Sequence, residues 1–253
     1  MTSKLIIFDI DGTAVEAKAD ALPTKKLVDV ASRLLTNRDI HLVCATGRTY
    51  PWAKIVTSAL GLYDPCIVSA GTQIVDPKSG KELWSKRLDN NAVSSSLRIF
   101  SEMGLDPKIL TETDTPNTAK VASQLTARPF LLLDVQDIKP EQVDEVIINI
   151  KAVADVEIAK VDSPNPGFIN LHITNKQATK EHAIEELSKI LKISKANIYG
   201  IGDGYNDIHL FNSVGTKVAM GNSVPELKKV ADIVIKSLAE DGLAEYLESF
   251  YTN

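Results

Sequence analysis

The chain has 253 residues, of which 44% are hydrophobic, and it has a formal net charge of −5 at pH 7. This length and composition are typical of a globular protein with a large core, and they exclude the disordered and fibrous classes. The negative charge and the lack of a dense Lys/Arg cluster argue against a nucleic acid or an anionic membrane as the main partner. We therefore expect a small-molecule partner.

The two cysteines, Cys44 and Cys66, lie in apolar stretches without a nearby Cys or His that would complete a metal or redox motif. We expect both to be reduced core residues. The first apolar segment begins at Leu5, which leaves no room for a signal sequence, and no apolar run approaches the roughly 18 residues of a membrane span. The expected location is the cytoplasm, and the expected state is a monomer or a small homo-oligomer.

Short apolar segments alternate with helical periodicity in the first part of the chain. Residues 5–8 are apolar, residues 27–35 repeat apolar side chains at helical spacing, and residues 42–45 are apolar again. A helix over residues 53–60 and a strand over residues 66–68 are predicted next. This alternation is typical of a parallel sheet covered by helices.

The same alternation returns near the C-terminus. A helix and three strands are predicted there, over residues 183–191, 198–201, 218–220 and 233–235. The fold class is therefore α/β, with a Rossmann-like, doubly wound parallel sheet that is split in sequence. We expect this core to comprise residues 1–82 and 175–253.

The middle block, residues 83–174, has a different pattern. Its predicted elements are helices over residues 92–103 and 143–150, an apolar run over residues 130–133 and two late strands. Polar residues recur at every second position in residues 168–173, which predicts a sheet with one solvent-facing side. We interpret the block as an inserted α+β domain.

Two carboxylates follow the first predicted strand directly. Asp9 and Asp11 are two residues apart, so in an extended chain both side chains point to one face, toward the same ligand. Two unpaired acids there would repel each other, and a cation is therefore expected. Gly12 allows the backbone to turn sharply beside that ligand.

Further polar residues follow two other predicted strands. Thr46-Gly47-Arg48 comes after residues 42–45, and Gly202-Asp203-Gly204-Tyr205-Asn206-Asp207 comes after residues 198–201, while Lys180 opens the helix before the latter strand. Ligands of open α/β sheets bind beyond the carboxyl ends of the strands, so these residues are expected at one rim.

Carboxylates, a hydroxyl and an ammonium group at one rim suit a hard divalent cation together with a phosphoryl group. Mg²⁺ prefers a few carboxylates, waters and substrate oxygens to a cage made only of protein ligands. Asp203, Asp207 and one carboxylate of Asp9 would supply that arrangement, and we include Asp11 in the expected metal site.

Asp9-Ile10-Asp11-Gly12-Thr13, Thr46-Gly47-Arg48, Lys180 and the segment 202–207 resemble, in order, the four motifs of the haloacid dehalogenase superfamily. Further segments, at residues 219–223, 225–228, 231–232 and 240–242, resemble the tail of its Cof-type phosphatases. In that group a large α/β cap lies between the second and third motifs, as residues 83–174 do here. The resemblance implies that this block is a cap domain for substrate selection.

The resemblance also implies a two-step phosphoryl transfer. Asp9 would attack phosphorus to form an aspartyl phosphate, which water then hydrolyses, and covalent catalysis of this kind splits one hard step into two. Asp11 would protonate the leaving alkoxide and then take a proton from the water. Thr46 and Lys180 would bind the phosphoryl group, with Mg²⁺ holding it in line with Asp9.

The phosphate is expected to lie among Gly12, Thr46, Gly47, Arg48, Lys180 and Asn206. Arg48 has two open interpretations: a contact with the substrate or a cap for the helix that follows.

The leading hypothesis is a Mg²⁺-dependent phosphatase of small phosphomonoesters, with sugar phosphates as the expected class because related capped enzymes use them. A phosphomutase or phosphotransferase and a catalytically silent protein that binds a phosphorylated ligand are the alternatives. A phosphorylatable receiver domain is disfavoured, because such a domain has its phosphorylated Asp on a central strand of a chain about half as long.

Overall fold

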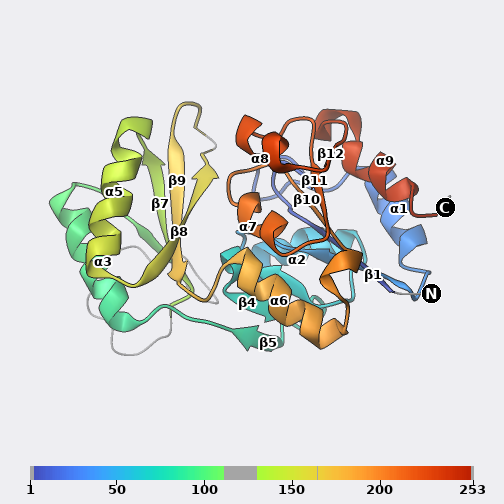
Figure 1. The fold of residues 1–253 in the computed structure, drawn as a ribbon, viewed down its shortest axis with the longest axis horizontal. Coiled ribbons are helices and arrows are strands. Elements are labelled where there is room, and N and C mark those ends of the chain that lie inside the picture. Colours follow the sequence, from blue (N-terminus) through green and yellow to red (C-terminus); the bar gives the residue numbers. More distant parts are fainter. Residues whose placement is uncertain (1–2, 111–129, 164, 252–253) are drawn as a thin grey trace. The chain divides into compact units, whose positions relative to one another are not determined.

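A computed structural model describes residues 3–110, 130–163 and 165–251, which fall into two compact units (Figure 1). One unit comprises Met1–Trp84 and Lys180–Asn253, and the other comprises Ser85–Thr179. The chain therefore crosses between units slightly later than the predicted boundaries at residues 82 and 174. No helix in the described part of the chain combines the length and apolar character that crossing a lipid bilayer requires.

The discontinuous unit contains the predicted parallel sheet. Five strands pair in the order β12-β11-β10-β1-β2, and each neighbouring pair is parallel. These strands are β1 (Lys4–Phe8), β2 (Ile40–Cys44), β10 (Ile198–Gly202), β11 (Thr216–Ala219) and β12 (Ile233–Val234). A smaller sheet, β3-β4-β5, consists of β3 (Cys66–Val68), β4 (Gln73–Val75) and β5 (Glu82–Ser85), and a parallel bridge from Ala45 to Ile67 links β2 to β3.

Helices accompany this sheet as the alternation predicted. They are α1 (Lys25–Leu34), α2 (Tyr50–Ala59), α6 (Lys180–Leu191), α7 (Asp207–Asn212), α8 (Pro225–Val230) and α9 (Gly242–Glu248), with 3₁₀ turns at Ser69–Gly71, Lys195–Asn197 and Leu238–Glu240. Helix α1 begins after Thr24, whose hydroxyl accepts a hydrogen bond from the Leu27 N–H as an N-cap. Helices α1 and α9 pack together, and α6 packs against α7 (Figure 1).

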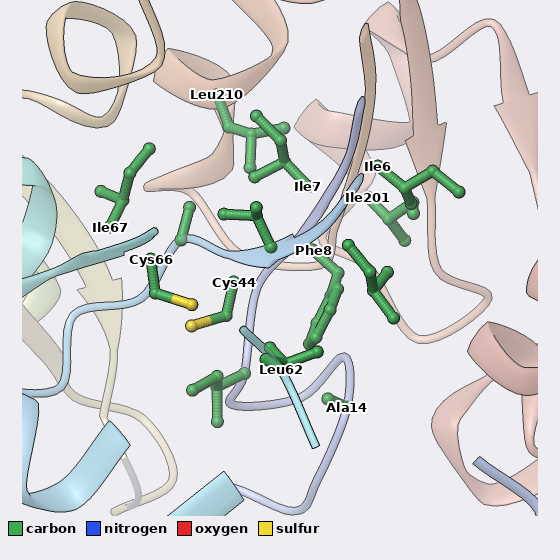
Figure 2. Close-up of a cluster of buried hydrophobic side chains, with 14 of the residues drawn as sticks. Ile6, Ile7, Phe8, Ala14, Cys44, Leu62, Cys66, Ile67, Ile201 and Leu210 are labelled. Carbon is green, nitrogen blue, oxygen red and sulfur yellow. The ribbon is translucent and has the colours of Figure 1, made fainter. Parts of the chain in front are cut away.

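Both faces of β1 are buried, which confirms the doubly wound arrangement. Successive side chains of a strand point to opposite faces, and Ile7 and Phe8 are both inaccessible to solvent. Figure 2 shows Ile7 on the side of Leu210 from α7, and Phe8 on the side of Leu62. The catalytic candidates after Phe8 are thus attached to a strand held from both sides.

The two cysteines lie in this core, as predicted. Cys44 and Cys66 are free thiols without solvent exposure, and Figure 2 shows their sulfur atoms pointing toward each other. The hydrogen bond with Cys66, together with burial, raises the pKa of the Cys44 thiol well above its usual range. The two thiols pack in this core as small apolar side chains.

The continuous unit is an α+β domain with its own core. Its strands are β6 (Lys108–Leu110), β7 (Leu132–Ile138), β8 (Val156–Asp162) and β9 (Ile169–Asn175), and its helices are α3 (Asn90–Glu102) and α5 (Pro140–Val153). The strands form an antiparallel sheet in the order β6-β7-β9-β8. Helices α3 and α5 lie side by side on one face of this sheet (Figure 1).

The prediction of a solvent-facing side for residues 168–173 is wrong. Asn170 is buried, and only 12% of the His172 side chain is exposed. Asn170 accepts a hydrogen bond from the N–H of Asp137 at a bulge in β7, and His172 lies beside Asp134, its register partner. The polar side chains of Asn170 and His172 thus lie against groups of the neighbouring strand β7.

Candidate active site

The predicted nucleophile, Asp9, lies at the carboxyl end of β1. The N–H of Asp9 donates to the carbonyl of Ile201 over 2.9 Å, so the parallel pairing of β1 with β10 continues into the motif. The Asp9 side chain is 6% exposed. The fold therefore places this carboxylate in a nearly dry environment at the rim of the sheet.

Lys180 joins two of the predicted carboxylates. Its ammonium group donates to Asp9 Oδ1 over 2.9 Å and to Asp207 Oδ1 over 2.7 Å, and the lysine side chain is 2% exposed. Lys180 is the first residue of α6, and Asp207 is the first residue of α7. Two helix starts and one strand end thus converge on a single buried ion-pair network.

The remaining bonds of the acidic residues fix their orientation. Asp207 Oδ2 accepts the backbone N–H groups of Asp203 and Gly204, over 2.9 and 3.0 Å. Asp203 Oδ1 accepts the hydroxyl of Thr13 over 2.6 Å. Ligand oxygens of Asp9, Asp203 and Asp207 all lie within 4.8 Å of one another.

The charges in this group do not balance. Burial raises the pKa of Asp9 to about 7, with repulsion from Asp207 and Asp11 adding to the effect of burial and Lys180 opposing it. Burial, then repulsion from Asp207 and Asp9, raises the pKa of Asp203 to about 8. Burial acts to lower the pKa of Lys180, but Asp207 and Asp9 outweigh it, and the net direction is upward. The three carboxylates therefore repel one another, and the single positive charge of Lys180 does not neutralise all of them.

A hard divalent cation would resolve this imbalance. Mg²⁺ binds oxygen ligands and takes a few carboxylates while keeping waters and substrate oxygens. Asp9, Asp203 and Asp207 supply such oxygens at one point, so the residues fit the ion. The carboxylate of Asp11, which we also expected in the metal site, is not part of this group. Both of its oxygens are bound to the Arg48 guanidinium instead.

Two glycines allow the acidic residues to come this close. Gly12 has φ +80°, and a Cβ atom added to it would lie 2.0 Å from Asp203 Oδ2. A Cβ added to Gly202 would lie 2.4 Å from Asp207 Oδ2. Only residues without a side chain fit at these two positions.

Thr46 lies at the end of the neighbouring strand, fully buried. Its hydroxyl accepts the N–H of Arg48 over 3.1 Å, and its carbonyl accepts the N–H of Ala70 over 3.0 Å. Ser69 and Ala70 adopt φ values of +54° and +60°, and this unusual turn holds the segment 46–48 in place. The segment Ser69-Ala70-Gly71 directly follows β3, and this position at a strand end is the signal from which its role could have been predicted.

The helix-cap interpretation of Arg48 does not hold, and its contact with a substrate stays a prediction. Its guanidinium binds Asp11, and α2 begins after Thr49, not after a cap from Arg48. Gly47 lies partly exposed between Thr46 and Arg48. Asn206 precedes α7 and makes no capping hydrogen bond with its side chain. Contact of these residues with a phosphate stays a prediction.

Two further residues support the site. The Asn222 amide donates to the Gly12 carbonyl over 2.9 Å, and its oxygen accepts the N–H of Leu238 over 2.8 Å. The Ser223 hydroxyl donates to the Gly202 carbonyl over 3.0 Å. Both follow the carboxyl end of β11, and that position is the signal from which they could have been predicted.

The chain is similar to known proteins over almost its whole length. Residues 6–247 match the sequence profile of the haloacid dehalogenase-like hydrolases. The protein YkrA of Bacillus subtilis is 28% identical over 96% of this chain and 96% of its own length. Phosphoglycolate phosphatase 1 of Saccharolobus solfataricus is 26% identical over 97% of this chain and 94% of its own. Among solved structures, the subclass IIB sugar phosphatase BT4131 matches 98% of this chain and 99% of its own, with a TM-score of 0.79 and 20% identity.

Proposed function

The chain belongs to the haloacid dehalogenase-like hydrolases and is a phosphatase of that family, and from this premise we propose that it is a Mg²⁺-dependent enzyme acting on small phosphomonoesters through an aspartyl phosphate. The observation that supports the proposal most directly is the buried network of Asp9, Lys180 and Asp207 beside Asp203. It unites a nucleophile, a cation for the phosphoryl oxygens and a ligand set for the metal.

In the first step Asp9 would attack phosphorus. A bond forms between an Asp9 oxygen and phosphorus, the ester P–O bond breaks, and the leaving alkoxide takes a proton from Asp11. Lys180 already donates to Asp9 and would neutralise the added phosphoryl charge, and the buried Thr46 hydroxyl would donate to a phosphoryl oxygen. Mg²⁺, when held by Asp9, Asp203 and Asp207, would supply positive charge that orients the phosphoryl group.

In the second step water would hydrolyse the intermediate. Asp11 accepts a proton from the water, the oxygen bonds to phosphorus, and the Asp9–phosphorus bond breaks to release inorganic phosphate. Such a scheme relies on positioning and electrostatics more than on any single reacting group. The buried, hydrogen-bonded Asp9 side chain suits that requirement.

Sugar phosphates are the proposed substrate class, supported by the sugar phosphatase among the structural relatives. We further propose that the α+β unit, residues 85–179, acts as the cap that selects the substrate. A small phosphorylated metabolite as partner and a cytoplasmic location complete the proposal.

Release of inorganic phosphate tests this function. Wild-type protein, Asp9→Asn and the control Asp155→Asn, which changes a carboxylate whose side chain is 80% exposed, are incubated with sugar phosphates, nucleotides and p-nitrophenyl phosphate in Mg²⁺ or EDTA. We expect Mg²⁺-dependent release by wild type and Asp155→Asn, and none by Asp9→Asn. Equal, negligible release from all three would refute the phosphatase and favour the mutase or the silent binder.

A further inference from the structure

The Arg48 side chain connects three parts of the site. It is only 7% exposed, and its guanidinium donates four hydrogen bonds. Two go to the Asp11 carboxylate, from Nε to Oδ2 over 2.9 Å and from Nη2 to Oδ1 over 2.7 Å. The other two go to the backbone carbonyls of Ala19 and Lys18, over 3.0 and 2.7 Å.

The pair with Asp11 is a two-point contact. A planar guanidinium that engages both oxygens of a carboxylate fixes its position and its orientation, which a single ammonium contact does not. Asp11 is 33% exposed, so the carboxylate stays accessible on its remaining side. Arg48 therefore holds Asp11 in one orientation without sealing it from a reactant.

The two hydrogen bonds from Arg48 to backbone carbonyls hold a loop in place beside Asp11. Residues 16–20 are exposed and lie outside any helix or strand, and Lys18 and Ala19 belong to this segment. Arg48 itself is fixed, because its N–H donates to Thr46 Oγ1 and its carbonyl accepts the N–H of Ser69. The strand-end turn thus positions the arginine, and the arginine positions both the loop and the carboxylate.

We propose that Arg48 is a positioning residue, which aligns Asp11 for proton exchange with the leaving group and anchors the loop at Lys18 and Ala19 next to it. The inference rests on the proposed function, because it assumes the acid–base role of Asp11. It replaces both earlier interpretations of Arg48, as a phosphate ligand or as a helix cap.

Leaving-group dependence distinguishes positioning of Asp11 from contact with phosphate. An alkyl phosphate such as glycerol phosphate needs a proton on its leaving oxygen, whereas p-nitrophenolate leaves without one. General acid catalysis contributes about 10²- to 10⁴-fold. We therefore expect Arg48→Met to lower kcat/KM for the alkyl ester at least about tenfold more than for p-nitrophenyl phosphate. Arg48→Lys should restore only part of the loss, because lysine cannot form the two-point contact.

Limited trypsin digestion tests the anchor without relying on turnover. Trypsin cleaves after Lys18, and the carbonyl of that scissile bond is one of the acceptors of Arg48. We expect cleavage at Lys18–Ala19 to be faster in Arg48→Met than in wild type, relative to cleavage at other lysines. Arg38→Met, at an exposed arginine, is the matched control and should change neither readout.

Unequal losses on the two esters together with faster cleavage at Lys18 would support the proposal. Equal losses on the two esters would overturn it, because Arg48 would then act on the shared phosphoryl group. Unchanged cleavage would overturn the anchoring role. If wild type hydrolysed neither these two esters nor any sugar phosphate, the proposed function would fail, and the acid–base part of this inference would fail with it.

Discussion

At the scale of single residues, burial raises the pKa values of two carboxyl groups of the cluster, Asp9 and Asp203. The pKa is about 7 for Asp9 and about 8 for Asp203, against an ordinary value of 3.8. The folded, metal-free protein thus binds these protons more tightly than the unfolded chain does. Its free energy of unfolding should therefore decrease as the pH rises from about 4 to about 8.

Mg²⁺ should reverse this loss of stability, because it must displace the same protons. Each displaced proton weakens metal binding about tenfold per pH unit below the pKa of its carboxyl group. We expect added Mg²⁺ to raise the melting temperature clearly at about pH 8 and much less at about pH 6. Thermal unfolding in Mg²⁺ and in EDTA at the two pH values measures the difference.

Asp203→Asn is the matched variant for this experiment. It removes one carboxylate from the cluster and one source of repulsion on Asp9. Both the Mg²⁺ effect and its pH dependence should shrink. An identical Mg²⁺ effect at both pH values in wild type would contradict the assignment of these carboxylates as the metal site.

At the scale of elements, the sequence allowed prediction of the parallel strands and of the acidic residues at their ends. Alternating apolar segments indicate such a sheet, and the carboxyl ends of its parallel strands lie at one rim. The proximity of Asp9, Asp203 and Asp207 could therefore be predicted from the sequence. The contacts of Arg48 could not be predicted from the sequence. They depend on the φ values of Ser69 and Ala70 and on the path of an exposed loop, neither of which has a periodic signal.

The prediction of a solvent-facing side for β9 was wrong for a related reason. Period-2 alternation indicates two different faces but not what covers each of them. Asn170 satisfies a backbone N–H at the β7 bulge, and this long-range contact is absent from the local pattern. Predictions from one sequence are therefore strongest where local pattern and topology decide, and weakest where a single side chain bridges distant segments.

The turn after β1 yields a prediction that separates backbone strain from damage to the site. Gly12 and Gly61 both have positive φ, +80° and +69°, but a Cβ at Gly12 would meet Asp203 whereas a Cβ at Gly61 would meet nothing within 4 Å. Gly61→Ala should cost about 1 kcal/mol of stability and leave activity unchanged. Gly12→Ala should add displacement of Asp203 and weaken Mg²⁺ binding about tenfold or more.

Urea denaturation and Mg²⁺ titration of activity measure the two effects. The comparison is informative because both variants bear the same kind of strain. If Gly12→Ala bound Mg²⁺ as wild type does, the close approach of Gly12 to Asp203 would not be needed for the metal site.

At the scale of the whole molecule, the two units have separate hydrophobic cores. The α+β unit packs α3 and α5 onto its sheet through residues such as Phe100, Val146, Leu171 and Ile173, and these belong to a different cluster from the core around β1. A domain with its own core can fold by itself. Insertion of residues 85–179 into the α/β chain therefore need not make the folding of either unit depend on the other.

We accordingly expect residues 85–179, produced alone, to fold into the same α+β domain. The four strands β6 to β9 and the helices α3 and α5, which the structure describes between residues 85 and 110, 130 and 163, and 165 and 179, all lie within that range, so none of them is cut. Dispersed amide signals in NMR spectra and a single cooperative thermal transition would be the result expected of a packed core. A fragment with helical circular dichroism but no cooperative transition would contradict the prediction, because it would mean that the core of this unit is completed by the α/β chain.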